Sequence, residues 1–150
     1  MVDEVHISTD LESIVGQRAW RPVRTHGSMF VLDLGQPEQP PSGTRLHGEW
    51  SFLFELANWR FEWPEGKSTR AGDIADEIDK AFAQMDLGLV ASASIEEEGS
   101  SLRIAFDHGV TLMVETNPIL GMHSEDQWLL YTPFKRVWIA NSDDIACENR

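Results

Sequence analysis

The aromatic stretch "GEWSFLFELANWRFEW", residues 48–63, limits the possible folds more than any other part of the chain. It holds three of the six tryptophans and three of the seven phenylalanines. Its apolar residues form two sets of opposite parity, one of Trp50, Phe52, Phe54 and Leu56, the other of Leu53, Ala57, Trp59, Phe61 and Trp63. Such alternation is typical of β-strands. The change of parity predicts a strand with a bulge or bend near Asn58, as in strongly curved sheets.

Two helices are predicted from apolar spacing and capping residues. In "DIADEIDKAFAQMDLG", residues 73–88, one helix face would carry Ile74, Ile78, Ala81, Phe82 and Met85. Asp73 is a suitable N-cap and Gly88 a suitable residue to end this helix. A shorter N-terminal helix is expected in "STDLESIVGQ", where Thr9 and Glu12 form a capping box.

The remaining apolar runs predict the strands of a sheet. They are residues 30–34, 89–95, 102–106, 110–114 and 128–131, with "RVWIA" at 136–140 as a further candidate. The segment "GQPEQPPSG", residues 35–43, contains three prolines and predicts a loop. We therefore predict a single α+β domain over residues 1–150. Its curved, mainly antiparallel sheet would have about six to seven strands, with one main amphipathic helix and a short N-terminal helix.

Composition and charge narrow the functional classes. The chain is 41% hydrophobic and 25% charged, as expected of a globular protein. Its net charge of −13 disfavours binding to nucleic acid or to anionic lipid and favours a basic protein partner. The single cysteine, Cys147, requires no oxidising compartment. No apolar run reaches the length of a membrane span. We expect a cytoplasmic protein, a monomer or homodimer, without a cofactor.

Four acidic residues are the candidate contacts to a basic partner. Glu96, Glu97 and Glu98 lie in one predicted turn, and Asp126 lies before a predicted strand. Three adjacent like charges need solvent or a cation, so this turn is either a solvated hairpin tip or a docking patch for basic residues.

Four tryptophans are the candidates for a ligand cleft: Trp50, Trp59, Trp63 and Trp128. Their edges would line a pocket for a small molecule in this second hypothesis. The competing interpretation is that the aromatic rings form the core of the sheet, since each buries about 150–250 Å².

A third hypothesis, a metal-dependent enzyme, uses His47, Glu49 and His123. Residues two apart on a strand point to the same side, so His47 and Glu49 can share one ion, and His123 would complete a two-histidine, one-carboxylate set. Exposed strand-end residues are the alternative. Asp33 and Glu55 interrupt apolar strands and face either solvent or a sheet interior, where Arg60 or Arg103 would have to neutralise them.

The chain also resembles a broad group of proteins. The segments "LESIVGQRAWRPVRTHGSMFVLDLG", "NWRFE", "LRIAFDHGVTLMVETN" and "EDQWLLYTP" look like those of small uncharacterised bacterial α+β proteins, several of which are immunity proteins of polymorphic toxin systems. The likeness consists of hydrophobic spacing, one hairpin and a late tryptophan, and it carries over no functional residues. It implies a non-catalytic binding protein, such as an immunity-type inhibitor of a toxin.

Overall fold

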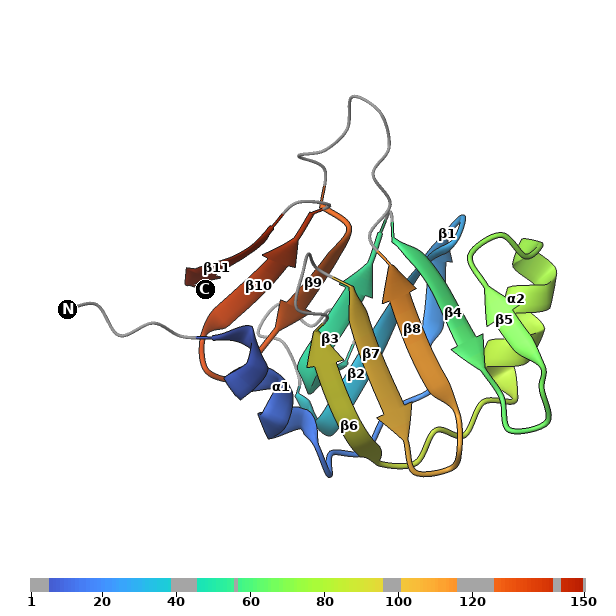
Figure 1. The fold of residues 1–150 in the computed structure, drawn as a ribbon, viewed down its shortest axis with the longest axis horizontal. Helices are drawn as coiled ribbons and strands as arrows, with labels where there is room; N and C mark the ends of the chain where they lie inside the picture. The colour runs from blue at the N-terminus through green and yellow to red at the C-terminus, as the bar shows by residue number, and fades with distance from the viewer. Residues whose placement is uncertain are drawn as a thin grey trace.

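In the computed structural model, the described residues are 6–38, 46–55, 57–95, 101–115, 126–141 and 144–149. They form two helices and eleven strands (Figure 1). In chain order the elements are α1 (Ile7–Ile14), β1 (Val23–His26), β2 (Met29–Glu38), β3 (His47–Phe54), β4 (Asn58–Glu62), β5 (Ser68–Arg70), α2 (Ala75–Ala83), β6 (Val90–Ile95), β7 (Leu102–Phe106), β8 (Thr111–Glu115), β9 (Trp128–Tyr131), β10 (Arg136–Ala140) and β11 (Ile145–Asn149).

The strands form two sheets that pack face to face. The first sheet has the order β1-β2-β3-β9-β10-β11, and the second has the order β5-β4-β8-β7-β6. All strand pairs among the described residues are antiparallel. The mainly antiparallel α+β class is thus confirmed, but the single sheet of six to seven strands was wrong. The edge strands β1, β5 and β11 were missed, because their sequences, VRTH, STR and IACEN, show little alternation of apolar and polar residues.

The change of parity in the aromatic stretch marks a passage between the two sheets. β3 ends at Phe54 in the first sheet, and β4 begins at Asn58 in the second. The predicted single strand with a bend near Asn58 was therefore wrong. Even-numbered side chains of β3 and odd-numbered side chains of β4 all face the space between the sheets, so the buried parity has to change at the crossing.

Phe30 on β2 lies at the centre of an aromatic cluster that joins both sheets to α2. Its ring centroid is 4.6 Å from that of Phe54, 4.7 Å from that of Trp59 and 5.4 Å from that of Phe82. Phe61 lies 5.6 Å away in a tilted contact. All five rings are at most 3% exposed. Burial of this much aromatic surface supplies a large part of the hydrophobic free energy of folding.

The helices close the open sides of this sandwich. α2 packs against the edge strands β1 and β5, and α1 packs against the edge strand β6 (Figure 1). Their predicted caps were wrong. α1 starts after His6, so Thr9 lies within the helix. α2 starts after Ile74, which is 74% exposed, and the Asp73 carboxylate accepts a hydrogen bond from the backbone of Arg70.

β2 is longer than the predicted run at residues 30–34 and continues to Glu38, within the proline-containing segment that was predicted to be a loop. Pro37 lies opposite Gly48 on β3, so the first four residues of the predicted loop are strand, and residues 39–45 lie outside the described part of the chain. The register shifts between Leu34 and Pro37, and Gly35 has a φ of +84° there. The shift is a bulge of the kind that accommodates proline in a sheet.

Candidate functional site

Three arginines lie in one line across the second sheet, and we call them the arginine row. Arg70 on β5 is directly opposite Arg60 on β4, and Arg60 is opposite Met113 on β8. Met113 is in turn opposite Arg103 on β7. Residues directly opposite each other on neighbouring strands have side chains on the same face of the sheet. The row therefore crosses four adjacent strands.

The arginine row points away from the core. On each strand, the neighbouring residues are buried between the sheets: Trp59 and Phe61 on β4, Thr69 on β5, Leu112 and Val114 on β8, and Leu102 and Ile104 on β7. Because side chains alternate between the faces of a strand, the arginines and Met113 lie on the outer face of the sheet. This face thus carries a quarter of the twelve basic residues of a chain whose net charge is −13.

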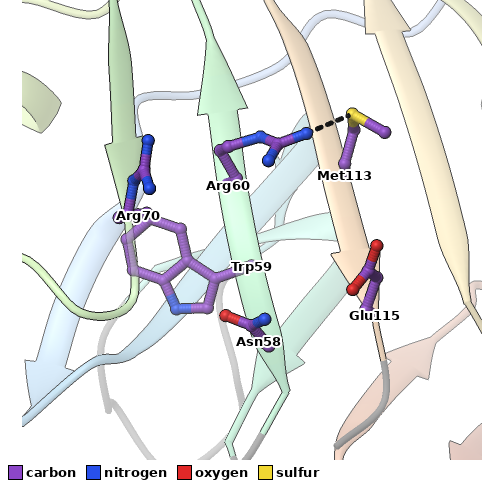
Figure 2. Close-up of a pocket in the computed structure, with 6 residues that line it drawn as sticks. All are labelled: Asn58, Trp59, Arg60, Arg70, Met113 and Glu115. Carbon is purple, nitrogen blue, oxygen red and sulfur yellow. Dashed lines mark hydrogen bonds between the residues drawn. The ribbon is translucent and has the colours of Figure 1, made fainter.

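A small recess of about 100 Å³ lies along this row (Figure 2). It is lined by Asn58, Trp59, Arg60, Arg70, Met113 and Glu115. Figure 2 shows the Arg60 guanidinium extending from β4 across to Met113 on β8, while Arg70 stands on the neighbouring strand β5. The Trp59 indole is 1% exposed, so this residue closes the floor rather than the rim of the recess.

The polar contacts of Arg60 use only part of its guanidinium. Nη2 lies 2.8 Å from a carboxylate oxygen of Glu62 and 3.4 Å from the sulfur of Met113, to which it donates. Nε is buried and has no hydrogen-bond partner among the described residues. Arg70 donates to the Ser68 hydroxyl at 2.8 Å. A buried N–H without an acceptor costs free energy.

The arginine row costs stability in the isolated protein. Like charges directly opposite each other on neighbouring strands repel, and Arg70 and Arg60 are such a pair. The Glu62 carboxylate offsets part of this repulsion, and the Glu115 carboxylate also lines the recess. A surface that retains such a repulsion in an otherwise acidic protein is a candidate site for a negatively charged group.

A second, wider recess of about 350 Å³ adjoins the first. It shares Arg60 and Arg70 and is also lined by Glu62, Trp63, Gly66, Lys67 and Ser68. The Trp63 indole N–H donates to the Thr69 hydroxyl at 3.1 Å. A half-buried aromatic ring beside three cationic side chains provides both an apolar surface and charge for a ligand.

The four tryptophans predicted to line a cleft do not come together. Trp50 and Trp128 belong to the first sheet and are 6% and 0% exposed. Trp59, at 1% exposed, donates its indole N–H to the carbonyl of Ser28 at 2.8 Å. Trp63 alone among the four is half-buried beside a surface recess. The competing interpretation, that the rings form the core, therefore describes the other three.

The predicted metal ligands His47 and Glu49 lie on the same side of β3 beside a recess of about 220 Å³. Glu49 accepts a hydrogen bond from the backbone N–H of Gln36 at 2.9 Å, which ties it to the bulge in β2. His123 lies outside the described residues. Within the described part of the chain, no group of three or more histidine, cysteine or carboxylate residues is placed to hold a metal ion.

The predicted partner-binding acids are mostly beyond what the structure describes. Glu96, Glu97 and Glu98 lie outside the described residues, and Asp126 is half-buried just before β9. The prediction of a basic partner through these four residues stays a prediction.

The two carboxylates within strands have different environments. Asp33 is 3% exposed, and its Oδ1 accepts a hydrogen bond from the backbone N–H of Gly48 at 3.1 Å. A backbone amide thus partners this oxygen, whereas Arg60 and Arg103 lie on the outer face of the other sheet. Glu55 is half-buried just after β3.

A buried ion pair escaped the sequence analysis. Asp10 on α1 is 2% exposed, and its carboxylate accepts two hydrogen bonds from Arg136, at 2.6 and 3.0 Å, and one from the indole of Trp138 at 2.6 Å. The hydrogen bonds to Asp10 raise the pKa of Arg136. Residues 126 positions apart give no local signal of such a pair. The contact fastens α1 to β10, and its saturated hydrogen bonding indicates a structural role.

Comparisons with known proteins assign no family. Among the described residues, neither helix is long and apolar enough to cross a membrane. No protein-family model, no curated protein and no solved structure matches this chain.

Proposed function

We propose that this chain is a non-catalytic binding protein that recognises an acidic segment of a partner protein through the arginine row. The observation that carries the proposal is the direct opposition of Arg70 and Arg60, continued through Met113 to Arg103. Guanidinium groups form charge-assisted hydrogen bonds with carboxylates, often two in parallel, and each arginine of the row offers N–H donors for such bonds.

The length of the row favours an extended segment over a single small anion. Neighbouring strands lie about 4.8 Å apart, so Arg70 and Arg103, three strands apart, are separated by roughly 14 Å. One carboxylate or phosphate cannot reach both. An extended acidic peptide lying across the strands would place successive side chains within reach of all three arginines.

An oligo-glutamate peptide with a fluorescent label tests the proposal by anisotropy. We expect Arg60→Ala and Arg70→Ala each to weaken binding by about tenfold, because each removes a charge-assisted hydrogen-bonding group. The titration is best done at about 0.15 M salt, where the repulsion from the net negative charge is screened beyond about 8 Å.

Arg21→Ala is the matched control, since Arg21 is exposed outside this sheet and the variant changes the net charge equally. Equal weakening by all three substitutions would mean that only net charge matters. That result, or no peptide binding by the unsubstituted protein, would contradict the proposal.

A small-molecule ligand is the second candidate function, favoured by Trp63 beside Arg60, Arg70 and Lys67 in the wider recess. Quenching of tryptophan fluorescence by an aromatic carboxylate, abolished by Trp63→Phe, would support it. The immunity-type role implied by the resemblance is one form of protein binding and stays a prediction, as does the third hypothesis of a metal-dependent enzyme.

A further inference from the structure

β11 differs from the other three edge strands of the two sheets in what lies beside it. α2 packs along β1 and β5, and α1 packs along β6. β11, at the end of the six-stranded sheet, pairs with β10 on one side. In Figure 1 no described helix or strand is drawn beyond it.

The hydrogen bonds at the preceding turn determine which backbone groups of β11 face outward. Asn141 donates its backbone N–H to the carbonyl of Asp144 at 2.9 Å, and the register continues as Ile139 opposite Ala146 and Val137 opposite Glu148. In an antiparallel pair, hydrogen-bonded and non-hydrogen-bonded positions alternate. Ala146 and Glu148 therefore bond to β10. The N–H and C=O groups of the other three residues point away from the sheet: Ile145, Cys147 and Asn149.

Two of the three outward N–H groups are available to an incoming strand. The Ile145 N–H donates to the Asp144 carboxylate at 2.8 Å. Within the described part of the chain, the N–H groups of Cys147 and Asn149 and the carbonyls of all three residues have no backbone partner, and these groups remain for an incoming strand. Edge strands are usually protected by charged side chains, proline or a bulge; β11, with the sequence "IACEN", has one charged residue, Glu148, no proline, and a regular pairing with β10.

We propose that β11 pairs antiparallel with β11 of a second copy of this chain, about a two-fold axis at Cys147. Cys147 then lies opposite Cys147 of the second copy, and Ile145 lies opposite Asn149. This register forms four hydrogen bonds: two between the Cys147 residues, and two from the Asn149 N–H groups to the Ile145 carbonyls. It is self-complementary, as a two-fold interface must be.

The charges of β11 fit this register. Glu148 is the one charged residue among Ile145–Asn149, and it lies opposite Ala146 of the second copy rather than opposite another carboxylate. Like charges directly opposite each other would destabilise the pair. The pairing extends the six-stranded sheet across both copies. Because both copies carry a net charge of −13, association should strengthen as salt screens their repulsion.

Disulfide trapping tests the register, because Cys147 is the sole cysteine and any disulfide joins two chains. Opposed residues at a hydrogen-bonded antiparallel position lie about 5.5 Å apart between Cα atoms, within the range that a disulfide spans. A mild oxidant such as diamide, which takes up the two thiol hydrogens, should convert the chain to a covalent dimer. The control is Asn149→Cys in a Cys147→Ser background. Its thiols would be four residues apart, roughly 13 Å, and should cross-link at least about tenfold more slowly.

Analytical ultracentrifugation with two substitutions at position 147 tests the hydrogen bonds. Cys147→Ser keeps the N–H and should associate as the unsubstituted chain does. Cys147→Pro removes an N–H that β10 does not use, so it should be monomeric with an unchanged sheet by circular dichroism. Concentration-independent monomers for the unsubstituted protein, or equal cross-linking of the Asn149→Cys control, would overturn the proposal. If Cys147→Pro fails to fold, the comparison of disulfide cross-linking at Cys147 and at Asn149→Cys still tests the proposed pairing.

Discussion

The buried carboxylate of Asp10 provides the sharpest test of how this fold is held together. Asp10→Ala leaves the Arg136 guanidinium and the Trp138 indole N–H without the acceptor that now receives three hydrogen bonds. Removing one partner of a buried ion pair costs about 3–5 kcal/mol, since the remaining charge is no longer compensated. The Arg136 side chain is 25% exposed, so water can solvate part of it. We therefore expect a loss at the lower end of this range, about 3 kcal/mol.

Urea unfolding monitored by tryptophan fluorescence measures this loss. For a chain of 150 residues, 3 kcal/mol corresponds to a decrease in Tm of roughly 9 °C. Asp10→Asn should lose less, because an amide oxygen still accepts from Trp138 although it no longer neutralises Arg136. A double-mutant cycle with Trp138→Phe separates the two contributions.

Asp79→Ala is the matched control for this prediction. Asp79 also forms two hydrogen bonds with one arginine, Arg24, at 2.8 and 3.0 Å, and it also links a helix to a strand. Its side chain is 49% exposed, however, so solvent screens the pair and its loss should matter much less. If the two alanine variants lose the same free energy of unfolding, burial of Asp10 is not what makes its ion pair important.

Two further predictions concern a close approach of strands and the reactivity of a thiol. Gly48→Ala should destabilise the protein by about 2 kcal/mol, because a Cβ at position 48 would collide with the backbone of Leu34. Gly72 has open space around it, so Gly72→Ala should leave the stability unchanged. Thermal unfolding of both variants measures the difference. Desolvation raises the pKa of the Cys147 thiol, so the pH at which its alkylation rate by iodoacetamide reaches half its maximum should lie above the value measured for free cysteine under the same conditions. A midpoint at or below that value would contradict the stated cause.

Local patterns in the sequence were sufficient for most individual elements. The run "WLLY" became β9, "RVWIA" became β10, and the helix predicted within residues 73–88 became α2. These predictions succeed because the periodicity of apolar residues reports which side of an element is buried, whatever that side packs against. The same limit explains the error in the aromatic stretch. Its parity change predicts a bend in one strand, but a crossing between two sheets leaves the same pattern.

For the arginine row too, part of the arrangement can be derived from the sequence and part depends on the tertiary structure. The sequence left Arg60 and Arg103 as possible interior partners of Asp33 and Glu55, although apolar neighbours on both sides of each arginine are consistent with the outward orientation that the structure shows. That Arg70, Arg60 and Arg103 form one line depends on strand order and register, which bring β5, β4, β8 and β7 together from distant parts of the chain.

By itself, then, the sequence determined most of the buried apolar positions, most of the elements that they form and that the protein is strongly acidic, because these are local or summed properties. Tertiary structure alone decided that the strands divide into two sheets, that Asp10 meets Arg136 and Trp138, and that three arginines share one face. Each of these depends on contacts between residues far apart in the chain. Apolar periodicity is nearly the same for every arrangement that buries the same faces, so it cannot select among them.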